Sequence, residues 1–540
     1  MHLGIILEIL LFSRRQFSGK GLVGVYLFNK RVFMSFLRAF LVVTLLGLAA
    51  QLAAQNIFYS DPDRTDPKSL QFELIGKMGG QFLVYKSYRD QHFIVVFDNN
   101  MRTIQKIKLP LESNRLLSTD FLVYPEFAWF FYQYYYKGAV YAAALKIDPS
   151  GNPVGKEIIL DSTQRMSFST NKIYSVINSE DKQQIMVFKI NTSNNNRHIL
   201  TTCLFNKELT LQKKSVVPVE MPQNNDFLSE FTLFNDGELV CIRASGTSSN
   251  DNINKVTLIF KDPLWDAIST GELQIKGVYL DDVRLRADNI NKHYVISSFF
   301  SKTRRGNIDG LYYAVWDKSK HTELMHATTL LSDELRADAK GEGSLKTAFN
   351  DFYINQVIMR RDGGFILTAE LVYTSTRGGN LNRWDYLYGS PYRMPGDYFL
   401  WTNPMGFYPW GYNGMFNTTN FTRYYAENVL VISFDPSGRM EWSNIIRKSQ
   451  FDDNSDNMIG FGMVNTGDQL HFLFNAYEKR IQILSDQSIS SEGQLIRNPT
   501  FKNLDRGFEF MPRYAKQVGL RQVLIPCQYR GFICFAKIEF

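Results

Sequence analysis

Two five-residue stretches, Ile147-Asp148-Pro149-Ser150-Gly151 and Phe434-Asp435-Pro436-Ser437-Gly438, decide the fold of this chain. In each, an apolar strand runs into a turn in which Pro presets φ, Asp accepts backbone hydrogen bonds and Gly adopts a positive φ. Related strand ends recur at Phe97-Asp98, Phe205-Asn206, Phe260-Lys261-Asp262 and Trp316-Asp317. The turn residues 98, 148, 206, 262 and 317 are 50, 58, 56 and 55 positions apart, and 118 positions separate 317 from 435. This recurrence indicates an internal structural repeat.

The sequence around these turns is typical of strands. Short runs of β-branched and aromatic residues alternate with Gly, Asn and Asp, and helical periodicity is scarce after residue 55. The runs include 81–85, 92–97, 184–188, 365–368 and 429–434, whereas the short, charged stretch 332–340 is compatible with a helix. A second turn signature precedes buried strands at Asn235-Asp236-Gly237, Arg361-Asp362-Gly363-Gly364 and Asn465-Thr466-Gly467-Asp468. Two hairpins in each repeat predict four strands in each repeat.

These observations predict an all-β fold, a β-propeller of four-stranded antiparallel blades, because one such blade cannot bury both of its faces alone. The 486 residues from 55 to 540, less the insertion 377–424 described below, give about 55 residues per blade for eight blades and about 63 for seven. Eight blades are favoured, and seven are the alternative. The C-terminal strands at 522–528 and 532–540 lack a fourth partner, so residues 56–59 are expected to supply it. Two stacked β-sandwiches are less favoured, because no Pro/Gly/Ser-rich linker divides the chain.

On its period and turn chemistry, the chain resembles secreted bacterial-type β-propellers as a superfamily, over nearly all of residues 55–540. No specific family is identified. The pairs Trp265-Asp266, Trp316-Asp317 and Trp384-Asp385 lack the upstream Gly-His and the regular spacing of WD repeats. Kelch and sialidase-type repeat motifs are also missing from the sequence.

The N-terminal 54 residues are predicted to be a signal peptide region. An apolar run of 12 residues, 39–50, follows Arg38 and leads into the small residues Ala53 and Ala54. A membrane-spanning helix needs about 20 apolar residues, whereas the apolar part of a signal peptide has about 7 to 15. Met34 opens a compact version of this signal, so residues 1–33 are either an over-extended start or a long N-terminal region. An uncleaved signal anchor is the weaker alternative, and the mature chain is expected to have no membrane span.

Most of the positive charge belongs to this region. The whole chain carries a formal net charge of +7, and removal of residues 1–54 leaves 54 basic against 52 acidic residues, or +2. Binding to a nucleic-acid backbone requires a broad basic surface, so nucleic acid is not an expected partner. The predicted location is secreted, periplasmic or on the cell surface.

The segment 377–424 is rich in aromatic residues and interrupts one predicted blade, so it is expected to project as a long loop. Tyr and Trp combine an apolar face with a polar edge, which suits stacking on sugar rings or contact with a protein partner. The alternative is that these side chains pack on one another and fill the central channel. The candidate binding residues are Trp384, Tyr386, Tyr388, Tyr392, Tyr398, Trp401, Tyr408, Trp410 and Tyr412.

Motifs for catalysis, metals or cofactors are not found. The run 452–457 imitates the start of a calcium loop, but Asn457 and Met463 stand where an EF-hand needs Gly and Glu. No nucleophile elbow, phosphate loop or dinucleotide fingerprint is present, so no catalytic residue, metal or cofactor is predicted. A turn at Arg530-Gly531 would pair Cys527 with Cys534. The pair is then either a cross-strand disulfide or two buried thiols, since a hydrogen-bonded register opposes the bond.

The sequence therefore favours an exported, non-catalytic β-propeller that serves as a binding scaffold and recognises a glycan or a protein at the cell envelope through the aromatic loop. A carbohydrate-active propeller, either hydrolase or lyase, is the first alternative, and it requires carboxylates that face each other near the axis. A structural subunit of a cell-envelope complex is the second, and it predicts a large exposed apolar patch.

Overall fold

The computed structural model of the chain describes residues 56–67, 70–111, 113, 115–164, 172–194, 196–246, 251–340, 344–376, 422–453, 455–478, 481–498 and 507–540. Residues 57–539 form one compact unit built almost entirely of strands, as predicted. The predicted short helix is present as α3 (Asp333–Ala339), which begins where the Ser332 side chain accepts a hydrogen bond from the Leu335 N–H. No helix in the described part of the chain is long and apolar enough to cross a membrane.

The described strands form seven hydrogen-bonded sheets, and the antiparallel four-stranded meander is their common unit. The first sheet contains β2 (Gln71–Met78), β3 (Gln81–Tyr88), β4 (Gln91–Phe97) and β5 (Thr103–Lys108). The second contains β6 (Leu116–Val123), β7 (Ala128–Tyr136), β8 (Ala139–Ile147) and β9 (Pro153–Gln164). The third contains β10 (Ser175–Asn178), β11 (Gln184–Asn194), β12 (Arg197–Asn206) and β13 (Leu211–Glu220).

The fourth sheet is a double one. It contains β14 (Phe227–Leu233), β15 (Leu239–Gly246), β16 (Ile253–Lys261) and β17 (Ile268–Glu272), followed by β18 (Tyr279–Asp288), β19 (His293–Ser301), β20 (Gly310–Asp317) and β21 (Thr322–Leu330). Its two halves are joined by the single residue pair Ile253 and Leu280.

The remaining sheets complete the chain. One contains β22 (Phe352–Met359), β23 (Phe365–Thr376), β24 (Thr422–Phe434), β25 (Met440–Ile446) and the short β26 (Gln450–Asp453), which extends it beside β24. The next contains β27 (Gly462–Asn465), β28 (Gln469–Glu478), β29 (Ile481–Ser490) and β30 (Leu495–Arg497). The last contains β31 (Phe508–Phe510), β32 (Lys516–Gly519), β33 (Gln522–Tyr529), β34 (Phe532–Glu539) and β1 (Asn56–Tyr59).

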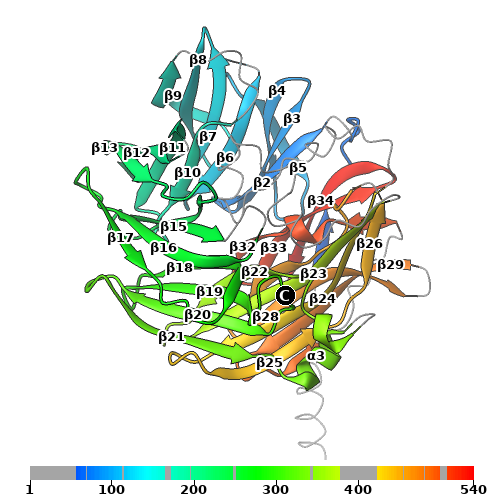
Figure 1. The fold of residues 1–540 in the computed structure, drawn as a ribbon. Helices are drawn as coiled ribbons and strands as arrows, with labels where there is room; N and C mark the ends of the chain where they lie inside the picture. Colours follow the sequence, from blue (N-terminus) through cyan, green and yellow to red (C-terminus); the bar gives the residue numbers. More distant parts are fainter. Residues whose placement is uncertain are drawn as a thin grey trace, which may run out of the picture. The chain divides into compact units, whose positions relative to one another are not determined.

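Successive sheets pack face to face around a closed circuit, and the colours of Figure 1 run around it in sequence order. Buried apolar side chains fill the space between neighbours; Phe130, for example, joins a cluster that includes residues of the first and second sheets. The circuit closes where Phe535 of β34 packs into one cluster with Phe82 and Phe97 of the first sheet. Because consecutive four-stranded sheets bury their faces against each other and the last meets the first, the unit has β-propeller architecture.

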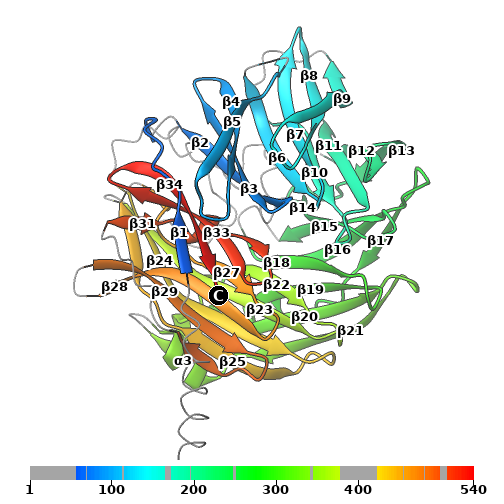
Figure 2. The same cartoon turned by 180° about the vertical axis from the view of Figure 1, so that it is seen from behind.

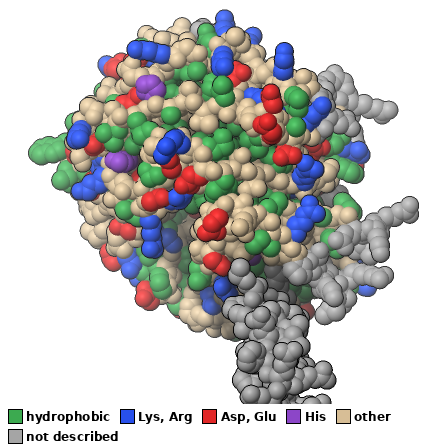
Figure 3. All heavy atoms as spheres, turned by 90° about the horizontal axis from the view of Figure 1, so that it is seen from below, with side chains coloured by type: hydrophobic (Ala, Val, Ile, Leu, Met, Phe, Trp, Pro, Cys, Tyr) green, Lys and Arg blue, Asp and Glu red, His purple; other side chains and the backbone are tan. Residues whose placement is uncertain are grey.

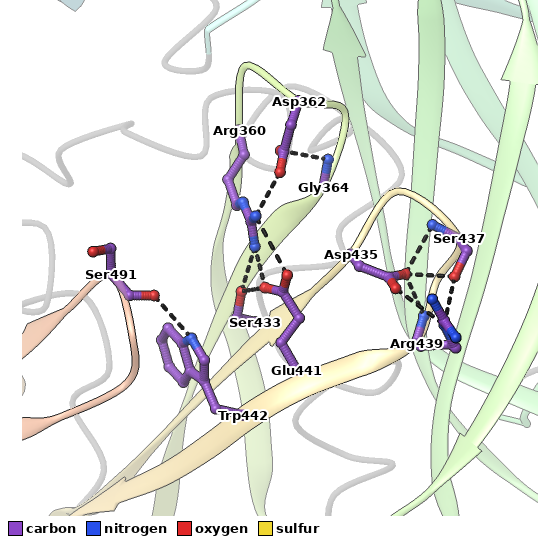
Figure 4. Close-up of polar contacts among 10 residues, drawn as sticks. All are labelled: Arg360, Asp362, Gly364, Ser433, Asp435, Ser437, Arg439, Glu441, Trp442 and Ser491. Atoms are coloured by element: carbon purple, nitrogen blue, oxygen red, sulfur yellow. Dashed lines mark hydrogen bonds and ion pairs between the residues drawn. The ribbon is translucent and has the colours of Figure 1, made fainter.

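The predicted turns link the third and fourth strands of their sheets. Each turn residue accepts hydrogen bonds from backbone N–H groups two to four positions later: Asp98, Asp148, Asn206, Asp262, Asp317 and Asp435. Figure 4 shows two turns of one sheet, with Asp435 holding the third-to-fourth turn and Asp362 accepting from the Gly364 N–H in the first-to-second turn. Both predicted turn signatures are confirmed.

We call the side of the unit that carries these turns the turn face, and the opposite side the connection face. Turns of neighbouring four-stranded units contact each other on the turn face, where the Asn235 N–H, in the first half of the double sheet, donates to Asn289 Oδ1, in its second half, at 2.9 Å. On the connection face, the chain passes from the second to the third strand and from each sheet to the next. This face therefore carries α3 and the strand ends Thr376 of β23 and Thr422 of β24.

Strand β1 completes the last sheet from the other end of the chain, as predicted (Figure 2). The Ser60 N–H donates to the Phe535 carbonyl at 2.8 Å, and the Phe535 N–H donates to Ser60 Oγ at 3.0 Å. Tyr59 also stacks on Phe508, with ring centroids 4.1 Å apart. The ring is thus closed by backbone pairing as well as by apolar packing.

Candidate functional site

The first strands of the sheets adjoin one another at the centre of the ring, where β2 contacts both β6 and β32. Four charged residues meet there, which we call the central cluster: Glu73 of β2, Asp120 of β6, Lys172 just before β10 and Lys516 of β32. Protein surrounds all four side chains, yet each keeps a small part of its surface accessible to water. The arrangement places two carboxyl groups and two amines in one confined, partly wet space.

Hydrogen bonds hold these side chains in place. Thr119 Oγ1 donates to Glu73 Oε2 at 3.4 Å, and the Phe121 N–H donates to Asp120 Oδ1 at 2.8 Å. Lys516 Nζ donates to the Leu74 carbonyl at 3.0 Å, which ties β32 to β2. The cluster is therefore positioned by strands from both ends of the chain.

Confinement changes the acidity of the cluster. Burial and the neighbouring Asp120 charge raise the pKa of Glu73 to about 8, against the opposing effects of Lys516, Thr119 and Lys172. Burial also raises the pKa of Asp120 and lowers the pKa values of Lys172 and Lys516. Glu73 is thus a carboxyl group that retains its proton near neutral pH, which is the state of a general acid.

A small cavity extends from the cluster between the second and third sheets, lined by Asp120, Lys172, Gln133 and Tyr174 among others. Gln133 fixes its wall, because its side chain bonds both the N–H and the carbonyl of Tyr174, at 2.8 and 2.7 Å. The Tyr174 hydroxyl donates to Asp161 Oδ2 at 3.0 Å. Polar groups therefore continue from the cluster into the interface between these sheets.

Asp161 is the hub of that interface. Lys189 and Lys214 each place Nζ 2.8 Å from one of its carboxylate oxygens. Burial alone would raise the pKa of Asp161, but the hydrogen bonds from both lysines hold it below the usual range. This carboxylate is consequently ionised and bound in a structural ion-pair network.

The aromatic candidates Trp384 to Tyr412 lie outside the described residues. The structure does describe the strand ends from which their segment departs, Thr376 of β23 and Thr422 of β24, so residues 422–424, which the sequence assigned to the insertion, belong to β24 instead. There Tyr373 and Tyr425 stack with ring centroids 4.5 Å apart, and Tyr373 donates to Glu427 at 3.0 Å. Phe451 of β26 lies beside them and is 52% exposed. Aromatic surface is thus already present at the base of the segment.

The other features that the sequence singled out, the calcium-like run 452–457 and the cysteines Cys203 and Cys241, occupy structural positions. Asp452 belongs to β26 and accepts from Ser455 at 2.8 Å, and Asp456, in the connection to β27, pairs with Arg513. In the described part of the chain, no three His, Cys, Asp or Glu residues gather as a metal site. Cys203 and Cys241 lie in two different apolar clusters. On the face drawn in Figure 3, acidic and basic side chains are interspersed, and neither sign dominates.

Comparison with known proteins adds no family. No family model and no curated protein matches the sequence. Among solved structures, the chain is similar to the WD40 domain of SCAP from fission yeast, with a TM-score of 0.39 and 10% identity over 90% of this chain and 98% of that one. It is also similar to prolyl oligopeptidase B from Galerina marginata (TM-score 0.38, 9% identity, 86% of this chain and 56% of that one). A third similar structure is a polysaccharide lyase of the ulvan lyase family PL25, with a TM-score of 0.34 and 9% identity over 77% of this chain and 90% of that one. The chain spans about half the length of the peptidase.

Proposed function

We propose that the unit is an eight-bladed β-propeller. Eight strands begin the successive four-stranded units: β2, β6, β10, β14, β18, β22, β27 and β32. The double sheet supplies two of these units, because only the pair Ile253 and Leu280 joins its halves. A single pair is a contact between neighbouring blades rather than a shared ladder.

We further propose that this propeller is exported and non-catalytic, and that it recognises a glycan or a protein at the cell envelope. The carrying observation is the insertion between Thr376 and Thr422, which extends one hairpin on the connection face by 45 residues rich in Tyr and Trp. The stacked Tyr373 and Tyr425 and the exposed Phe451 continue this aromatic character into the described strands. Aromatic faces bind sugars and protein partners by excluding water at small entropic cost.

The test replaces residues 377–421 by a short Gly-Ser turn and leaves β23 and β24 intact. The matched control replaces residues 499–506, which link β30 to β31 in the sequence, in the same way. We expect the first variant to lose at least tenfold in affinity for whatever glycan or envelope protein the parent chain from Gln55 captures, and the control to retain it. Equal binding profiles for all three proteins would contradict the proposal.

The central cluster favours a second candidate function, acid–base chemistry on a carbohydrate. Glycoside cleavage needs a protonated carboxyl group that donates to the leaving oxygen and a second, nearby carboxyl group. Glu73, with its pKa of about 8, fits the first role, and the neighbouring Asp120, whose charge helps to raise that pKa, is the candidate for the second.

The distinguishing experiment assays soluble polysaccharides with the parent chain, Glu73→Gln and Glu441→Gln. Glu441 is a control carboxylate, paired with Arg360 in the turn region of Figure 4, away from the central cluster. For an enzyme, Glu73→Gln is expected to lower turnover at least a hundredfold while Glu441→Gln leaves it unchanged. Turnover that survives Glu73→Gln would remove this candidate.

A further inference from the structure

Two cysteines face each other in the sheet that closes the ring. Cys527 of β33 and Cys534 of β34 are directly opposed partners, three positions on either side of the turn at Arg530 and Gly531. Both turn residues have positive φ, 49° and 82°, which is the geometry of a tight two-residue hairpin. The register is therefore fixed by the turn and cannot slip without turning both side chains to the other face.

The two sulfur atoms are already in contact. Cys527 Sγ and Cys534 Sγ lie 2.8 Å apart, and both side chains have no exposed surface. A disulfide requires about 2.05 Å between the sulfurs and about 4.4 to 6.8 Å between the Cα atoms. A hydrogen-bonded antiparallel pair has its Cα atoms about 5.5 Å apart, which is within that range. The hydrogen-bonded register is thus compatible with the bond, contrary to the expectation from the sequence.

We propose that Cys527 and Cys534 form a disulfide that locks the ring-closing β33–β34 hairpin. Each Sγ–H bond breaks as the Sγ–Sγ bond forms, so two protons and two electrons leave the pair. The electrons reduce the disulfide of an oxidant of the glutathione or dithiol–disulfide class to two thiols. The proposed export matters to this inference only because it would bring the chain into a compartment that supplies such an oxidant.

The surroundings determine when the bond forms. Burial, followed by the hydrogen bond from its partner, raises the pKa of the Cys527 thiol well above its usual value, and the thiolate is the reactive species in exchange. The neighbouring Phe535 is packed against the first sheet in the closed ring. Cys534 and Phe535 are successive residues of β34, so their side chains point to opposite faces of the sheet and the cysteine pair faces away from the first sheet. Both cysteine side chains are fully buried in the closed ring. The bond therefore forms while the hairpin is still accessible, before the ring closes, and it is afterwards protected from reductants.

The test counts thiols and maps the bond. Protein that is refolded from urea with oxidised glutathione, then alkylated in denaturant, is expected to show two free thiols, against four after full reduction. Trypsin cuts between the two cysteines at Arg530, so the bond links peptides 522–530 and 531–537, which separate on reduction. Folded, reduced protein given the same oxidant is expected to lose its thiols at least tenfold more slowly.

Three variants separate this bond from other thiol chemistry. The double variant Cys203→Ser, Cys241→Ser should still lose two thiols on oxidative refolding, whereas Cys527→Ser or Cys534→Ser alone should lose none to an internal bond. Four thiols after oxidative refolding of the parent chain, or linked peptides that contain Cys203 or Cys241, would overturn the proposal. Because purified protein and a defined oxidant are used, a failure of the export proposal would not affect this result.

Discussion

At the scale of single residues, Glu73 links folded stability to pH. In the unfolded chain a glutamate titrates near its ordinary pKa of 4.5, whereas burial raises the pKa of Glu73 to about 8 in the folded protein. Below pH 4.5 both states hold the proton. Between pH 4.5 and about 8 only the folded state holds it, so unfolding releases a proton and stability falls as the pH rises. The stabilising contribution is fully present below pH 4.5 and is lost by pH 8.

Replacement of this carboxyl should therefore flatten the pH profile. Between about pH 5 and 8, the parent chain should lose stability by on the order of 1 kcal/mol per pH unit because of Glu73. We expect the variant Glu73→Gln not to show this loss. Urea unfolding midpoints, measured at one-unit intervals from pH 5 to 9, test this. Asp120, whose pKa is also raised, leaves a residual slope in the variant. Parallel profiles for the variant and the parent chain would contradict the assigned state of Glu73.

At the scale of elements, the turns determine how neighbouring sheets meet. Gly151, in the turn between β8 and β9, has a φ of +84°, and an added Cβ would lie 2.8 Å from side-chain carbons of Val96 and Ile107 in the preceding sheet. Gly80, in the turn between β2 and β3, has nearly the same φ of +83° but nothing within 4 Å of an added Cβ. The two glycines share the backbone strain and differ in packing.

A pair of alanine variants separates these contributions. Gly80→Ala is expected to cost about 1 kcal/mol, from the positive φ alone. Gly151→Ala should cost about 3 kcal/mol, because the overpacked contact between sheets adds to that strain. Urea denaturation at one pH provides both values. Equal costs would mean that the turns do not transmit packing from sheet to sheet.

The elements could be predicted largely from sequence because turn chemistry is local. Every backbone group to which Asp148 and Gly151 are hydrogen-bonded in this turn lies within four positions of them in the sequence. The turn can therefore be recognised from the sequence alone, without knowing which sheets pack against it. Bulges in the first strands, such as the register shift between Ser229 and Thr232 of β14, were not predicted. At this bulge, Glu230 adopts a φ of +53°. Its carboxylate accepts a hydrogen bond at 3.1 Å from the Leu285 N–H of β18, the first strand of the next four-stranded unit. Such a conformation is stabilised by a partner about fifty residues away, and no local pattern records it.

At the scale of the whole molecule, closure of the ring depends on β1. A chain that begins at residue 61 should unfold at a markedly lower temperature than one that begins at Gln55, because it lacks the backbone bonds and the Tyr59–Phe508 stacking of the last sheet. A peptide of residues 55–62, added in excess, should restore part of the loss by pairing with β34. Thermal unfolding followed by circular dichroism measures both effects.

A matched peptide with Tyr59→Ala and Ser60→Pro should restore nothing, since it lacks the stacking ring and the N–H that donates to Phe535. If the truncated and longer chains unfold at the same temperature, β1 does not close the ring.

The central cluster shows why the site was not found from sequence. Glu73 and Lys516 come from opposite ends of the chain, and each is a single charged residue within an otherwise ordinary strand. Their proximity is a property of the closed ring alone. The one available signal was a charged residue in the first strand of a repeat, as in Gln71-Phe72-Glu73-Leu74, and it became meaningful only when the repeats were placed around a common centre.

The division into a turn face and a connection face has a consequence for how such a chain changes over time. Turns such as those at Asp148 and Asp435 contact the neighbouring sheet, so their lengths are constrained by packing. On the connection face, by contrast, α3 lies between β21 and β22, and β23 and β24 stay paired up to Thr376 and Thr422 although 45 residues separate them in sequence. Insertions and deletions should therefore accumulate on that side in related genes, and tags or foreign epitopes introduced there should leave the ring intact.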